Sequence, residues 1–113
     1  MAGKAEASPD GFRVWTESDQ GAVVVRAAGE LDIDSAGTFE DELRRTIAGE
    51  RSFVTLHLGD VEFIDSTGLR ALLSAVELSS MYGTRFAILR ELSPPVERAF
   101  EVAGMANTLP FID

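Results

Sequence analysis

The sequence has no cysteine, one histidine (His57) and one lysine (Lys4) among its 113 residues. Without cysteine the chain can form neither disulfides nor thiolate metal sites. Because the only lysine lies near the N-terminus, we expect no P-loop and no Schiff-base chemistry in the folded part. No apolar run approaches the roughly 20 residues of a membrane helix, and the first ten residues lack the apolar stretch of a secretory signal. These absences predict a cytoplasmic protein.

Positive charge is also scarce. Ten basic residues stand against nineteen acidic ones, which leaves a formal net charge of −9. Such a surface repels phosphate backbones and anionic lipids, so we expect neither nucleic acid nor a membrane as a partner. A basic protein surface would be attracted to it. The interaction partner that the charge favours is therefore another protein.

The length and the 45% share of hydrophobic residues are those of one globular domain. We expect a flexible tail over residues 1–10 and a single domain over 11–113. Patterns of apolar residues predict strands at 12–16, 22–28, 52–58 and 84–89, with a short edge strand within 109–113. The segment 17–21 reads as the turn of an antiparallel hairpin, and 29–34 reads as an acidic loop.

Three helices are predicted between and after these strands. Asp34 or Ser35 caps the first, the second covers about 67–81, and Ser93 caps the third, with prolines in its first turn and Gly104 at its end. The predicted buried stripes are Ala36, Phe39, Leu43 and Ile47 in the first helix, and Val96, Ala99, Phe100 and Ala103 in the third. The element order predicts an α/β (α+β-like) fold, with a mixed four- to five-stranded sheet, an N-terminal antiparallel hairpin and helices chiefly on one face.

The most informative stretch is Val61-Glu-Phe-Ile-Asp-Ser-Thr-Gly-Leu69, where a strand pattern gives way to a helix pattern. Ser66 is placed at the helix start, where free backbone N–H groups favour an anion, so it is a candidate phosphorylation site. The alternative is a plain N-cap, and the two roles are compatible. Thr67 is the weaker candidate for modification.

Its neighbours are open to two interpretations each. Gly68 either lets another protein approach or accommodates the backbone in the first helical turn. Asp65 either orients a hydroxyl or a metal ion bound to a kinase's nucleotide, or acts as a turn or cap residue. Farther along the helix, we expect Arg70 and Ser74 to face a partner and Leu78 to be buried. Asp32 and Asp34 are interpreted as solvated turn and cap groups rather than metal ligands.

Several segments together resemble the STAS domain, and more narrowly the bacterial anti-sigma factor antagonists. They are Gly29-Glu-Leu-Asp-Ile-Asp34, Val61-Glu-Phe-Ile-Asp-Ser-Thr-Gly-Leu69, Leu92-Ser-Pro-Pro-Val96 and Ala103-Gly-Met105. The resemblance implies phosphorylation of Ser66 by a partner that is both an anti-sigma factor and a serine kinase. It also matches Asp32 to an acidic residue near the phosphoacceptor.

What the resemblance implies is a partner-switching cycle. The unphosphorylated antagonist binds the anti-sigma factor and frees a sigma factor, phosphorylation on Ser66 blocks binding, and a PP2C-type phosphatase restores the first state. The partner-binding face is expected to include Asp32, Asp65, Ser66, Thr67, Gly68, Arg70 and Ser74. We expect a protein of this kind to be a monomer.

Enzymatic function is not expected. A hydrolase elbow needs Gly-x-Ser-x-Gly, and Ile64 stands in the first glycine's place. His57 lies in a strand pattern, and neither a zinc site nor a dinucleotide loop can be assembled. We therefore predict no catalytic residue, no metal and no cofactor. Two alternatives to the antagonist remain: a STAS scaffold or transport-accessory subunit that is never phosphorylated, and a sensor of a small ligand or nucleotide.

Overall fold

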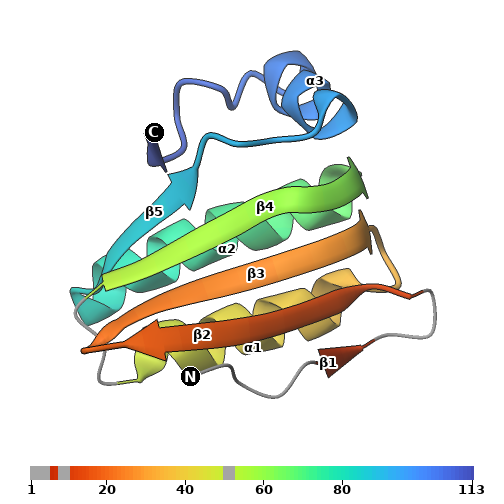
Figure 1. Ribbon diagram of the computed structural model, residues 1–113. Coiled ribbons are helices and arrows are strands. Elements are labelled where there is room, and N and C mark those ends of the chain that lie inside the picture. Colours follow the sequence, from red (N-terminus) through yellow and green to blue (C-terminus); the bar gives the residue numbers. More distant parts are fainter. Residues whose placement is uncertain (1–5, 8–10, 50–52) are drawn as a thin grey trace.

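The computed structural model describes residues 6–7, 11–49 and 53–113. Within the predicted tail only Glu6 and Ala7 are described, and the rest of that prediction lies outside these residues. Figure 1 shows the elements in chain order: β1 (Glu6–Ala7), β2 (Arg13–Asp19), β3 (Ala22–Leu31), α1 (Ala36–Ala48), β4 (Phe53–Ile64), α2 (Ser66–Tyr82), β5 (Arg85–Leu89), α3 (Pro94–Val102) and β6 (Phe111–Ile112).

The described strands form one mixed sheet in the order β1-β2-β3-β4-β5-β6. The pairs β1–β2 and β2–β3 are antiparallel, whereas β3–β4, β4–β5 and β5–β6 are parallel. This arrangement confirms the predicted mixed sheet with its N-terminal hairpin. The outermost strands, β1 and β6, have only two residues each, and β6 is the edge strand expected near the C-terminus.

The hairpin turn is tighter than predicted. The strands continue through most of the segment 17–21, so the turn consists of Gln20 and Gly21. Both residues have positive φ, 51° and 86°. Two such residues make the type of turn whose twist matches that of the flanking strands, which explains why the ladder extends to Asp19 and Ala22.

Strands β3 and β4 are also longer than predicted, because they pair with each other to their ends. β3 includes residues 29–31, which were expected in a loop, and β4 runs to Ile64 instead of ending at 58. Residue 52, the predicted start of this strand, lies outside the described residues. The β3–β4 pairing contains two register shifts, between Arg26 and Ala28 and between Gly29 and Glu30. Such irregularities change the direction in which later side chains point.

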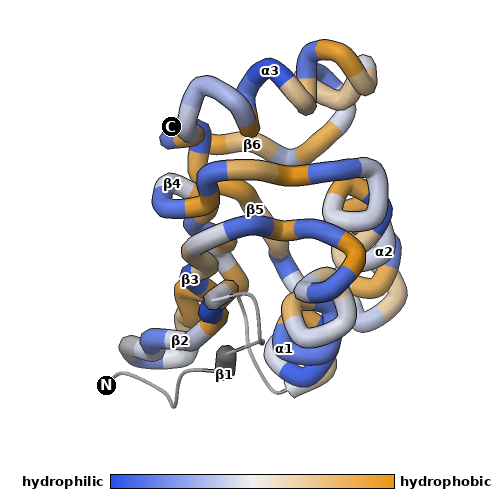
Figure 2. Tube along the Cα trace, turned by 90° about the vertical axis from the view of Figure 1, so that its right-hand side faces the viewer, coloured by the Kyte–Doolittle hydropathy of each residue, from blue (hydrophilic) through white to orange (hydrophobic). Residues whose placement is uncertain are grey.

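Helices α1 and α2 cover the same face of the sheet, as Figures 1 and 2 show. The predicted stripe of α1 is buried throughout, with Phe39 and Ile47 fully enclosed. These side chains pack against alternate residues of the central strands, among them Val25 of β3 and Leu56 of β4. The prediction that helices lie chiefly on one face is confirmed.

The opposite face of the sheet carries polar groups. Trp15 of β2 donates a hydrogen bond from Nε1 to Glu17 (3.3 Å), and Arg26 of β3 donates one from Nε to Glu17 (3.0 Å). The Arg26 bond, followed by that from Trp15, lowers the pKa of the Glu17 carboxyl. No helix is needed to cover a face with this composition.

Helix α3 follows β5 and contacts β4. Ser93 is its N-cap, as predicted, but its hydroxyl donates to the Val61 carbonyl at 2.7 Å and therefore ties the helix start to β4. Ala103 was predicted in the buried stripe and is instead the exposed C-cap. The helix ends one residue earlier than the apolar pattern suggested, and the chain turns away at Gly104, where φ is +73°.

Candidate partner-binding and phosphorylation site

The candidate site lies where β3 and β4 end side by side. The two strands are parallel, and their last paired residues are Leu31 and Ile64. The backbone N–H of Asp65 donates to the Leu31 carbonyl at 3.1 Å, which extends this contact by one residue. The loop 32–35 and the start of α2 are thereby held next to each other, at the right-hand edge in Figure 1. Residues 32 and 66, far apart in the chain, therefore lie near each other at one edge of the sheet, the edge formed by the carboxyl-terminal ends of β3 and β4.

Asp65, not Ser66, is the N-cap of α2. Its Oδ1 accepts hydrogen bonds from the backbone N–H groups of Thr67 (2.9 Å) and Gly68 (3.1 Å). The interpretation of Ser66 as the cap is therefore wrong, and the alternative of a capping role for Asp65 is confirmed. Ser66 is the first residue of the helix and is exposed. Its hydroxyl has no hydrogen bond to any residue that the structure describes. This hydroxyl therefore does not hold the described part of the fold together.

Gly68 is buried against the end of β3. A Cβ atom at this position would lie 2.8 Å from Ile64 Cγ1, from Leu31 Cγ and from the Leu31 carbonyl oxygen. Because one of these neighbours is backbone, it could not move aside easily. Of the two interpretations of Gly68, close packing of the first turn of α2 against Leu31 is the one that this geometry favours.

Asp32 organises the neighbouring loop. Its Oδ1 accepts hydrogen bonds from the backbone N–H groups of Asp34 (3.0 Å) and Ser35 (3.3 Å). Ser35, the N-cap of α1, is fully buried and donates from Oγ to the Glu30 carbonyl at 2.7 Å. Asp32 thus holds the loop in shape and remains half-buried beside the start of α2.

The other predicted residues follow along α2. Thr67 is half-buried, Arg70 is exposed one turn after Ser66, and Ser74 is half-buried one turn later. Leu78 packs partly against the core, and it shares with Ser74 the lining of a hollow of about 210 Å³ between α1 and α2. Ser66, Arg70 and Ser74 recur at intervals of four residues and therefore share one side of the helix.

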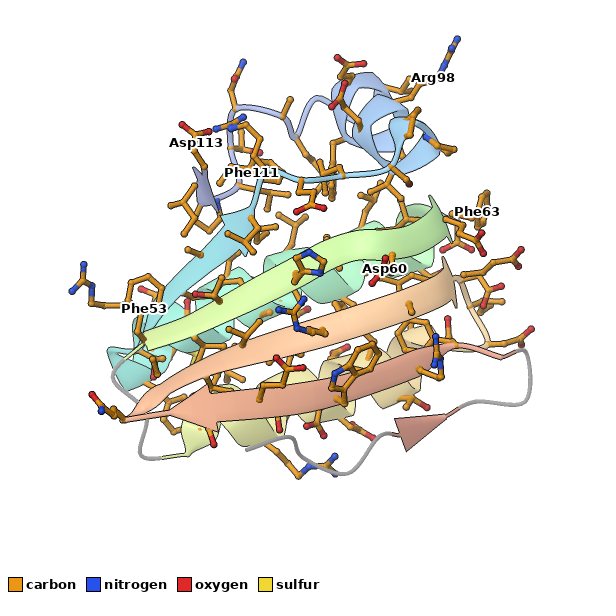
Figure 3. The ribbon with its side chains drawn as sticks, in the orientation of Figure 1. Phe53, Asp60, Phe63, Arg98, Phe111 and Asp113 are labelled. Carbon is orange, nitrogen blue, oxygen red and sulfur yellow. The ribbon has the colours of Figure 1, made fainter. Side chains whose placement is uncertain are left out.

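Three exposed apolar side chains around this edge were not predicted. Ile33 in the loop is 74% exposed, Phe63 at the end of β4 is 46% exposed, and Leu73 of α2 is 43% exposed. Figure 3 shows Phe63 at the end of β4. An isolated isoleucine between two aspartates is a signal that could have revealed Ile33. Phe63 gives no such signal, because strict alternation would bury it together with Val61.

The edge is acidic as well as partly apolar. Glu30, Asp34 and Glu62 are exposed around Ser66, and Asp65 and Asp32 are half-buried. Arg70 is the basic residue that α2 contributes. A surface that combines apolar side chains with a negative rim suits a partner with an apolar and basic surface.

Other kinds of site find no support in the described residues. There, no three His, Asp or Glu side chains are grouped so that they could hold a metal ion. His57 is buried, and its Nε2 lies 3.6 Å from an oxygen of Glu91 rather than beside Ser66. None of the helices described is long and apolar enough to cross a bilayer.

Comparison with known proteins identifies the family of this chain. The family model described as the STAS domain matches residues 13–113. The chain belongs to the STAS domain family. The anti-sigma F factor antagonist of Paenibacillus polymyxa is 28% identical to this STAS domain over 103 residues, which are 90% of this chain and 87% of the relative.

Solved STAS structures share the fold. An anti-sigma factor antagonist from Mycobacterium paratuberculosis has a TM-score of 0.79 at 27% identity, with 94% of this chain and 89% of that chain covered. SpoIIAA of Bacillus, an anti-sigma factor antagonist at 22% identity, has been solved unphosphorylated (TM-score 0.72, 88% and 86% covered) and phosphorylated (TM-score 0.66, 88% and 89% covered). Relatives of this chain are thus named as anti-sigma factor antagonists.

Proposed function

We propose that this protein is an anti-sigma factor antagonist controlled by phosphorylation of Ser66. In its unphosphorylated form it binds an anti-sigma factor that is also a serine kinase, and a sigma factor is released. Phosphorylation of Ser66 blocks this binding, and a PP2C-type phosphatase reverses it. The binding face comprises Asp32, Asp65, Ser66, Thr67, Arg70 and Ser74, joined by the exposed Ile33 and Phe63. Gly68 is buried beneath this face and allows the start of α2 to pack against Leu31.

One observation carries the proposal. Ser66 is exposed and its hydroxyl makes no hydrogen bond to the described residues, because Asp65 is the residue that caps the helix. A kinase can therefore reach the oxygen without unfolding the helix start. The flanking Ile33 and Phe63 supply apolar area of the kind that partner proteins cover. That SpoIIAA exists in both phosphorylation states supports the same role for a chain with its fold.

The chemistry is a simple phosphoryl transfer. Ser66 Oγ attacks the γ-phosphorus of ATP bound to the kinase, and the bond from that phosphorus to the bridging oxygen breaks. ADP leaves, and a base of the kinase accepts the hydroxyl proton. In the reverse direction, the phosphatase uses water to cleave the serine phosphate ester, which restores the hydroxyl and releases inorganic phosphate.

The phosphate opposes binding through its charge. It adds about −1.5 to −2 charges at an edge that is already acidic. Enclosing such a group in an interface without a new cation costs several kcal/mol. Since each 1.4 kcal/mol is about a tenfold change in affinity, even part of this penalty dissociates a working complex. Little change in the fold is required, because Ser66 is exposed in the unmodified protein.

Phosphorylation is tested by incubating the protein with ATP and a purified anti-sigma factor serine kinase from the same organism, followed by mass spectrometry. We expect one phosphate on wild type and on Thr67→Val, and none on Ser66→Ala. Thr67→Val is the matched control, because it removes the neighbouring hydroxyl. Equal phosphate incorporation in wild type and Ser66→Ala would contradict the site assignment.

Binding is tested by calorimetry with the same kinase. Ser66→Asp should weaken binding at least tenfold. Ser66→Asn introduces a side chain of the same shape as aspartate but without its charge, and it should bind within about threefold of wild type. If Ser66→Asp binds as tightly as Ser66→Asn, charge is not the switch. A complex unaffected by either substitution and by Ser66→Ala would support a scaffold role instead.

A further inference from the structure

Arg70 is the basic residue of helix α2. It is exposed, and in the part of the chain that the structure describes it takes part in no ion pair. On a helix, the neighbours of a side chain are three and four residues away. For Arg70 these are Ser66, Thr67, Leu73 and Ser74, and none of them is acidic. The unmodified helix therefore offers its guanidinium no counter-ion.

Two backbone N–H groups at the start of α2 are already engaged by Asp65 and are therefore not free to bind a phosphate on Ser66. The N–H groups of Thr67 and Gly68, which would otherwise attract an anion, already donate to the Asp65 carboxylate. A phosphate on Ser66 would also lie next to that carboxylate in sequence, and like charges repel. A phosphoserine here needs a cation to offset this repulsion.

We infer that Arg70 binds the phosphate of phosphorylated Ser66 and so acts as an intramolecular clamp. This inference rests on the proposed phosphorylation of Ser66. The two residues are four positions apart with the anion nearer the helix N-terminus, which is the more favourable order for such a pair. The guanidinium also matches the phosphate oxygens with parallel N–H donors.

The clamp gives Arg70 two alternative roles. In the unphosphorylated protein it projects from the face proposed to bind the partner. In the phosphorylated protein it is engaged by the phosphate. Phosphorylation would then remove a cation from the binding face as well as add an anion to it.

The test places phosphoserine at position 66 during translation, so that no kinase is needed, and follows the ³¹P NMR signal of the phosphate through a pH titration. Arg70 stabilises the doubly charged phosphate, so R70Q should raise its second pKa by about 0.15 to 0.4 pH units. R70K should keep part of the effect, because it retains the charge but not the paired donors.

The control is R98Q. Arg98 is also exposed on a helix, has no ion pair among the described residues, and lies on α3 away from the α2 start, as Figure 3 shows. Its substitution changes the net charge equally and should move the phosphate pKa by less than about 0.1 pH units, because distant exposed charges are screened. A shift in R70Q no larger than that in R98Q would overturn the inference.

The two proposals fail in different ways. If no kinase modifies Ser66, the proposed function fails, although the titration still reports whether Arg70 binds a phosphate at that position. If the kinase modifies Ser66 and the titration shows no effect of R70Q, only the clamp fails. Because Arg70 is exposed, circular dichroism should show the variant folded as wild type.

Discussion

Two helix starts meet at the same edge of the sheet, and each combines an aspartate with a serine. At the start of α1, the Ser35 hydroxyl is fully buried and bonded to the Glu30 carbonyl, and it also accepts the Asp32 backbone N–H at 2.9 Å. At the start of α2 the aspartate caps the helix, and the Ser66 hydroxyl is exposed. The same two residue types are thus used in opposite ways.

The difference shows what makes a serine available for modification. Both serines stand where a strand leads to a helix, so local sequence alone does not separate them. Ser35 is required to hold its loop together, and a phosphate there would break buried hydrogen bonds. Asp65 takes over the capping at α2 and leaves Ser66 with no structural task. Availability therefore depends on which neighbour satisfies the helix N–H groups.

The largest effect is expected from Gly68→Ala, which tests whether close packing of the start of α2 against Leu31 is required for stability. The added methyl would lie 2.8 Å from a backbone oxygen, so the helix would have to shift. We expect a loss of about 1–3 kcal/mol or more in the free energy of unfolding, measured by urea denaturation.

Gly37→Ala is the matched control for this substitution. Gly37 lies in the first turn of α1, and a Cβ there would have no neighbour within 4 Å. Alanine at this position should be neutral or should stabilise the protein by up to about 1 kcal/mol. A similar loss in both variants would mean that helix propensity, rather than contact with Leu31, sets the requirement for glycine.

The comparison of the two serines is tested directly by Ser35→Ala and Ser66→Ala. Removing the buried Ser35 hydroxyl deprives both the Glu30 carbonyl and the Asp32 backbone N–H of a hydrogen-bond partner, so we expect a loss of about 1–3 kcal/mol in the free energy of unfolding. Removing the exposed Ser66 hydroxyl should change it by no more than about 0.5 kcal/mol. Urea denaturation of both variants provides the measurement. Equal losses would show that Ser66 is also structural.

Much of this architecture could be predicted because it depends on local patterns. The stripe Ala36, Phe39, Leu43 and Ile47 has helical spacing, and all four residues are buried. The element order and the change from strand to helix before Ser66 were equally visible in the sequence.

What could not be predicted depends on contacts between distant segments. Asp65 and Ser66 are both good N-caps by propensity, and the choice between them is fixed only when the β3–β4 pairing carries Asp65 to the Leu31 carbonyl. The exposure of Phe63 follows from register shifts in that same pairing, which no alternation pattern reveals. The crowding at Gly68 likewise requires Leu31, which is 37 positions earlier in the sequence.

The smallest effect is expected from Asp65→Asn, which asks whether Asp65 holds the helix start by hydrogen bonds or by charge. The amide oxygen of asparagine can still accept the N–H groups of Thr67 and Gly68, so the loss should be less than about 0.5 kcal/mol. Asp65→Ala removes the acceptor and should cost about 1 kcal/mol. Both variants are measured by urea denaturation at low and high salt. If the two lose equally, and salt abolishes the difference from wild type, the carboxylate acts through the helix dipole, and the capping that separates Asp65 from Ser66 is electrostatic.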